Sequence, residues 1–127
     1  MKPFELDTAV AALARDGSSY VVAPAPGPPL RIEGFTVGAP VLTANPPHRG
    51  EMHPDGDELL YLISGRIEVI IEDGGTPTTV GAEQVQTLTP GRAIIVPRGS
   101  WHRINVCEPS HLIHITPGPG DGHRPLE

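Results

Sequence analysis

Histidines and acidic residues lie close together in two short segments of the chain, and both residue types bind metal ions. The first segment, GEMHPDGDELLYLISG at residues 50–65, contains Glu51, His53 and Glu58. The second, GRAIIVPRGSWHRINV at residues 91–106, contains His102. Imidazole and carboxylate groups together suit Mn, Fe, Zn or Ni. These segments therefore predict one divalent-metal site if the fold brings them together.

Local sequence patterns indicate how these side chains reach one another. Side chains alternate faces along a strand, so Glu51 and His53 point to the same side. A Pro-Asp-Gly-Asp turn follows, and the next apolar run begins with Glu58. In the second segment, a Pro-Arg-Gly turn at residues 97–99 precedes the run that carries His102. The mouth of a β-barrel is a usual place for ligands from separate strands to meet.

Short apolar runs separated by turn residues fill the chain from residue 20 onward, and they predict an all-β sandwich or barrel with mostly antiparallel neighbours. The 15 Gly and 16 Pro among 127 residues are typical of such a turn-rich fold. A short helix is expected from Asp7 or Thr8 to Ala14, and residues 117–127 are expected to form a flexible surface tail. The expected core consists of Leu59, Leu60, Leu62, Ile67, Val69, Ile71, Ile94, Ile95, Val96 and Ile104.

Length and composition exclude several classes of protein. A chain of 127 residues is close to the size of one domain. The single cysteine, Cys107, excludes an intrachain disulfide, and a formal net charge of -6 argues against a nucleic-acid surface. No apolar run approaches the roughly 18 residues of a membrane span, and the first residues show no secretory signal. We therefore expect a cytoplasmic protein that contacts neither nucleic acid nor membrane.

The two segments resemble the two sequence motifs of the cupin superfamily. In the first motif, His53 stands where the second family histidine belongs, and Glu58 and Gly65 have the family spacing. The second motif matches at Gly91, Pro97, Gly99 and His102. Two motifs in order are far more specific than one. The resemblance covers about residues 30–116 and implies a small antiparallel jelly-roll barrel, preceded by an N-terminal helix and edge segment at 1–29 and followed by the tail.

The chain departs from the family pattern at two positions. Glu51 replaces the first family histidine, and Val106 occupies the family asparagine position, with Asn105 one place earlier. The resemblance thus implies a metal set of Glu51, His53, Glu58 and His102. Two carboxylates and a divalent ion are about neutral together, which favours harder ions such as Mn²⁺ or Fe²⁺. Without Glu51, the other three still form a two-His, one-carboxylate triad with open positions.

Other readings of these residues stay open. A barrel of this kind is expected to be stable without metal. The alternative interpretation is therefore that the four residues are buried polar remnants of a lost metal site. His111 and His114 are three residues apart on the last apolar run, so only one of them faces the barrel interior. If that residue is His114, it either moves a proton or simply packs in the core. His48 and His123 are expected in a solvated loop and in the tail.

The resemblance predicts the function less specifically than the fold, because small cupins include isomerases, dioxygenases, lyases and proteins that only bind small ligands. The leading hypothesis is a metal-dependent enzyme for a small polar substrate such as a sugar, hydroxy acid or diketone. The group that moves a proton is expected to be His114, the candidate catalytic residue, or a carboxylate. The alternative is a non-catalytic binding or sensor module. The resemblance also implies a homodimer, in which exchange of a strand would cover the sheet edge at residues 18–36.

Overall fold

The structure is a computed structural model that describes residues 2–23 and 29–126. These residues form an all-β fold with antiparallel pairing throughout. The strands are β1 (Val10–Ala14), β2 (Ser19–Val22), β3 (Gly34–Gly38), β4 (Val41–Leu42), β5 (Gly50–Met52), β6 (Glu58–Asp73), β7 (Ala82–Leu88), β8 (Ala93–Val96), β9 (His102–Gly118) and β10 (Gly122–Arg124).

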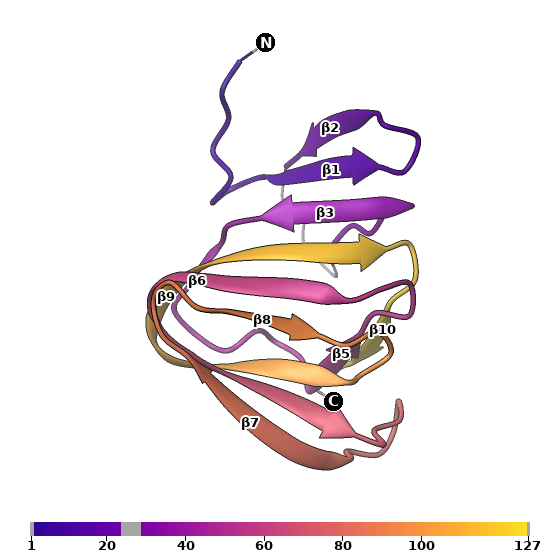
Figure 1. Cartoon of the computed structure of the whole chain (residues 1–127), viewed down its shortest axis with the longest axis vertical. Helices are drawn as coiled ribbons and strands as arrows, with labels where there is room; N and C mark the ends of the chain where they lie inside the picture. The colour runs from indigo at the N-terminus through magenta and orange to yellow at the C-terminus, as the bar shows by residue number, and fades with distance from the viewer. Residues whose placement is uncertain (1, 24–28, 127) are drawn as a thin grey trace.

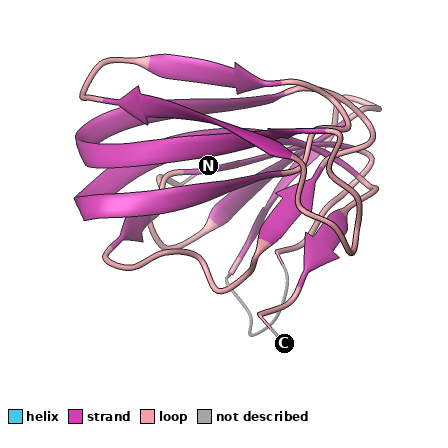
Figure 2. Ribbon diagram, turned by 90° about the horizontal axis from the view of Figure 1, so that it is seen from below, coloured by secondary structure: helices cyan, strands magenta, loops and turns pink. Residues whose placement is uncertain are grey.

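Two long strands organise the molecule (Figure 1). β6 and β9 pair with each other along most of their length. The first part of β6 also pairs with β8 and the second part with β7, while β9 continues the sheet to β3, β1 and β2. At its other end, β9 pairs with β5, which pairs with β10. Figure 2 shows the strands curving around a common interior, as expected for a barrel.

β6 joins two apolar runs that the sequence pattern separates at Ser64 and Gly65. The pairing register with β9 shifts at this point, so the predicted strand end is a bulge inside one strand. Gly65 has a φ of 91°, and a Cβ there would collide with Pro109 and Ser110. Only glycine is accommodated without strain, which lets β6 bend from one part of the sheet to the other.

Strand alternation divides the apolar residues between an inner core and an outer face. The core cluster consists of Leu60, Leu62, Ile67, Val69, Leu88, Val96 and Leu112. Leu59 and Ile95 do not belong to it, because each alternates with a buried neighbour and points outward, and Ile95 is 59% exposed. They lie in an outer row of directly paired residues that crosses six strands: Val21, Ala11, Val37, Ile115, Leu59 and Ile95.

The expected N-terminal helix is wrong: residues 10–14 form strand β1. β1 pairs with β2 on one side and β3 on the other, and its Ala12 is fully buried whereas Leu13 is 46% exposed. A helix of barely two turns is marginal in water, so the hydrogen-bond ladders of two neighbouring strands outweigh its local propensity. No helix among the described residues is long and apolar enough to cross a membrane.

The C-terminal segment also differs from the expected surface tail. Residues 117–118 complete β9, and β10 pairs with β5. Arg124 is only 1% exposed and donates to both carboxylate oxygens of Glu72, at 2.6 and 2.8 Å. Its guanidinium lies 4.4 Å from the ring centroid of Trp101. Residues 1, 24–28 and 127 of the expected terminal segments lie outside the described residues.

Candidate metal centre

Three strands bring the predicted ligands together. Glu51 lies in β5 and His53 directly follows it, while Glu58 begins β6 and His102 begins β9. Glu51 and His102 are direct cross-strand partners, so their side chains share one face. One potential ligand atom from each of Glu51, His53, Glu58 and His102 lies within 4.8 Å of all the others. We call these residues the Glu/His cluster.

The Glu/His cluster is buried and compact. His53, Glu58 and His102 are 2%, 3% and 1% exposed. Nε2 of His53 lies 3.6 Å from Glu51 Oε1 and 3.4 Å from Glu58 Oε2. Nε2 of His102 lies 3.5 Å from Glu51 Oε1 and 3.0 Å from Glu58 Oε1. The Nε2 atoms of His53 and His102 therefore face the same pair of carboxylates.

The backbone fixes which nitrogen of His102 is free to bind. Its Nδ1 donates a hydrogen bond to the carbonyl oxygen of Ser100 at 3.0 Å. In a neutral imidazole this leaves a lone pair on Nε2, directed at the carboxylates of Glu51 and Glu58. Lone pairs and carboxylates repel, so this arrangement needs a cation between them, either a metal ion or a proton on Nε2.

His53 lacks conventional hydrogen bonds: neither of its buried ring nitrogens has a partner among the described residues. Its nearest additional acid is Asp121, whose Oδ1 lies 3.7 Å from Nδ1. Burying an unsatisfied polar group is costly, and a ligand for Nε2 removes that cost. The donor types, burial and unsatisfied nitrogen of the Glu/His cluster all fit a divalent metal.

Without metal, protons take over the neutralising role. Burial alone would lower the pKa of His53 and His102, but the carboxylates of Glu51 and Glu58 outweigh burial and raise these pKa values to about 9 and about 10. Burial opposes ionisation of Glu58, yet the imidazoles lower its pKa to about 2 and also hold the pKa of Glu51 well below its usual range. Two imidazolium ions thus balance two carboxylates.

A hydrogen-bond chain connects the Glu/His cluster to His114. The Thr116 hydroxyl donates to Glu58 Oε2 at 2.6 Å, and Nδ1 of His114 lies 2.8 Å from that hydroxyl oxygen. A hydroxyl has one hydrogen, so His114 must donate through Nδ1, which leaves the lone pair on Nε2. Burial lowers the pKa of His114 and so favours the neutral form of the ring. Residue 38 is glycine beside this ring, since a Cβ there would lie 2.5 Å from Nε2.

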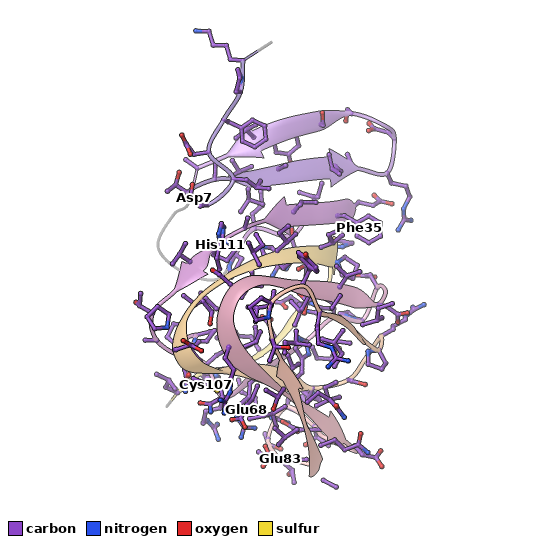
Figure 3. All side chains as sticks on the ribbon, turned by 60° about the vertical axis from the view of Figure 1, so that its left-hand side comes forward. Asp7, Phe35, Glu68, Glu83, Cys107 and His111 are labelled. Carbon is purple, nitrogen blue, oxygen red and sulfur yellow. The ribbon has the colours of Figure 1, made fainter. Side chains whose placement is uncertain are left out.

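Of the remaining histidines, His48 lies next to the Glu/His cluster, whereas His111 lies apart from it. His111, labelled in Figure 3, uses Nε2 for a hydrogen bond with the carbonyl oxygen of Ala39. His48 is not a solvated loop residue: it is half-buried, 3.9 Å from Glu51, and its ring packs edge-on against His123 of β10. The sequence patterns missed Thr116 and Asp121, although alternation along β9 places Thr116 on the same face as His114.

The pKa shifts predict opposite pH trends for metal-free and metal-loaded protein. Raised histidine pKa values stabilise the metal-free fold below about 6.5, and this stabilisation is lost as pH rises through about 9 to 10. The lowered Glu58 pKa stabilises it above about 4.5, and this is lost as pH falls through about 2. The metal-free melting temperature should therefore be highest between about pH 4.5 and 6.5.

Metal must displace the two imidazole protons, so its affinity should increase up to about pH 9, by as much as about 100-fold per pH unit. Melting curves of chelator-treated and reconstituted protein across pH measure both trends. A metal-free melting temperature that climbs steadily from pH 6 to 9 would contradict the proton-filled cluster.

Comparisons with solved structures show the fold. A cupin-2 domain protein from Shewanella frigidimarina has a TM-score of 0.53 and 18% identity, covering 75% of this chain and 83% of that chain. A variant of oxalate decarboxylase from Bacillus subtilis has a TM-score of 0.55 and 19% identity, covering 73% of this chain and 24% of that chain. Hydroquinone 1,2-dioxygenase from a Sphingomonas species has a TM-score of 0.53 and 14% identity, covering 69% and 63%.

Sequence comparison identifies the family. No curated protein sequence matches the chain significantly. The model of the cupin domain family Cupin_2 matches residues 41–116, which contain the whole Glu/His cluster, both cupin motifs and His114. Because this match spans more than half of the chain, the protein belongs to the cupin domain family.

Proposed function

We propose that the protein is a metal-dependent enzyme for a small polar substrate, with one divalent ion held by Glu51, His53, Glu58 and His102. The observation that carries this proposal is the placement of His102: its Nδ1 is held by the Ser100 carbonyl, so its Nε2 lies 3.5 and 3.0 Å from oxygens of two buried carboxylates. The unsatisfied nitrogens of His53 support it. When bound, the ion would polarise a substrate oxygen and stabilise negative charge on it.

The chain's own residues supply the proton chemistry in this proposal. His114 accepts a substrate proton at Nε2, because its Nδ1 hydrogen is committed to Thr116. Thr116 holds the imidazole in this tautomer and ties it to Glu58. A neutral buried base beside a polarised substrate oxygen suits isomerase or lyase chemistry, which we favour over oxygenation. Two structural neighbours are named as a decarboxylase and a dioxygenase, but at under 20% identity they transfer no substrate to this chain.

A second candidate is a metal-free binding or sensor module. The observation that favours it is the self-neutralising cluster, in which two imidazolium ions balance two carboxylates without an ion. Such a protein would bind small molecules in the barrel and turn none over.

A reconstitution assay separates these functions. Small sugars, hydroxy acids and diketones are incubated with Mn- and Fe-reconstituted protein, with and without O₂. We expect turnover with Mn that does not require O₂, and its loss in His114→Gln at unchanged metal content. Turnover only with Fe and O₂ contradicts the isomerase or lyase chemistry. Tight binding without turnover under any condition selects the binding module.

The homodimer also stays a prediction, now supported by the outer apolar row. Val21 and Ile95 at its two ends are 49% and 59% exposed, and Phe35, labelled in Figure 3, is 45% exposed. Exposed apolar sheet faces of this kind are typical of protein interfaces. Light scattering should give the mass of two chains, whereas the mass of one chain contradicts pairing.

A further inference from the structure

Arg31 is a half-buried arginine without a carboxylate partner among the described residues. Its Nη1 donates to the carbonyl oxygen of Leu30 at 3.2 Å and to the Thr36 hydroxyl at 3.0 Å. Its Nε is buried and has no hydrogen-bond partner in that part of the chain. A buried N–H of a cationic group that makes no hydrogen bond destabilises the protein. A bound anion would accept this hydrogen bond and also balance the positive charge of the guanidinium.

Two threonines connect Arg31 to the Glu/His cluster through the barrel interior. Thr36 of β3 is the direct cross-strand partner of Thr116 in β9, and both are buried. The Thr36 hydroxyl lies 3.5 Å from the Thr116 carbonyl oxygen, and the Thr116 hydroxyl donates to Glu58. The positive charge of Arg31 therefore lies on the same inner side of the sheet as Glu58 and His114.

Electrostatics agrees with this placement. Burial is the main cause of the lowered pKa of His114, and the charge of Arg31 lowers it further. Burial raises the pKa of Asp121, and Arg31 partly opposes that increase. Arg31 thus lies near enough to influence both His114 and Asp121.

Charge balance then limits the substrate. Two carboxylates and a divalent ion are about neutral, so the metal centre alone has little preference for an anion. Arg31 adds one positive charge to the interior, and a guanidinium binds carboxylates through paired hydrogen bonds. A sugar or a diketone would leave this charge without a partner.

We propose that Arg31 binds a carboxylate group of the substrate, which makes the substrate a small hydroxy or keto acid whose second oxygen faces the Glu/His cluster. This inference rests on the proposed function and narrows its substrate class. Arg31 is then the residue that selects acids over neutral sugars and diketones.

The test compares a carboxylate with its neutral analogue. Calorimetry measures binding of glycolate and glycolamide, and of pyruvate and pyruvamide, to metal-loaded protein whose metal content is measured on the same sample. We expect the wild type to prefer each acid over its amide by at least about 10-fold, because only the acid forms a charge-assisted bond with Arg31. Equal binding of acid and amide, or no binding of either acid, would overturn the proposal.

Variants assign the preference to Arg31. Arg31→Gln should weaken acid binding by about 10- to 100-fold and leave amide binding unchanged, while Arg31→Lys should restore part of the preference. Arg15→Gln is the matched control, because that arginine is an exposed surface residue paired with Glu33. Unchanged acid binding in Arg31→Gln refutes the assignment. An Arg31-dependent preference in protein that takes up no metal would support Arg31 while contradicting the proposed metal function.

Discussion

His53→Ala and His102→Ala should each abolish stoichiometric retention of a divalent metal. Each change removes one of the four candidate donors that the described residues bring together, and it leaves the carboxylates of Glu51 and Glu58 with a single imidazole. Loss of groups that merely support a ligand typically weakens metal affinity by 10- to 100-fold, so loss of a ligand itself should exceed about 100-fold. Elemental analysis after dialysis of reconstituted protein measures retention.

His111→Ala is the matched control for these variants. His111 lies on β9 like His102, but its ring nitrogen bonds to the Ala39 carbonyl and takes no part in the Glu/His cluster. The control should retain metal at the wild-type level. Wild-type metal retention in either His53→Ala or His102→Ala would remove that residue from the ligand set.

Glu51→Ala distinguishes a four-ligand site from a three-ligand one. Glu51 is the least buried member of the cluster, with a side chain that is 19% exposed, yet one of its oxygens contacts both imidazoles. We therefore expect metal affinity to fall strongly in this variant as well. An unchanged affinity would show that His53, Glu58 and His102 suffice.

The second large effect concerns stability, because Arg124→Leu should destabilise the fold by about 3 kcal/mol. The change leaves the buried carboxylate of Glu72 without its two strongest hydrogen bonds. It also removes the donors to the carbonyl oxygens of Thr76 and Thr79 and the contact with Trp101. Guanidinium denaturation measures the loss of unfolding free energy.

A double variant separates the ion pair from the packing. Replacing both Glu72 and Arg124 by Leu removes the unpaired charge, so it should recover part of the stability lost in Arg124→Leu. Arg15→Leu, at an exposed pair with Glu33, should change stability little. An Arg124→Leu protein as stable as the wild type would contradict the anchoring of β10 by this residue.

Local patterns predict only part of the candidate ligand set, and the resemblance to the two cupin motifs supplies its convergence. Strand alternation puts Glu51 and His53 on one side, and turns place Glu58 and His102 at the starts of strands. The same alternation predicts that one of His111 and His114 points inward, and the structure shows that it is His114. Alternation does not show which neighbouring apolar runs form one continuous strand. In the sequence, the bulge at Gly65 therefore resembles the end of a strand.

Long-range pairing explains the errors at both ends of the chain. Residues 10–14 contain several alanines, a good helix former, but β2 and β3 supply backbone partners that their sequence does not reveal. Arg124 lies in a Gly- and Pro-rich segment, and its partner Glu72 is far away in sequence. Arg31 is missed for the same reason, since only the pairing of β3 with β9 brings it toward Glu58.

Metal content of the untagged protein tests the central claim most directly. Chelator-treated protein is reconstituted with Mn, Fe, Ni and Zn in turn, dialysed and analysed for metal per chain. The geometry of the Glu/His cluster predicts about one divalent ion per chain with at least one of these metals. Protein that retains none of them above pH 8, where metal competes best with the imidazole protons, would contradict the metal centre.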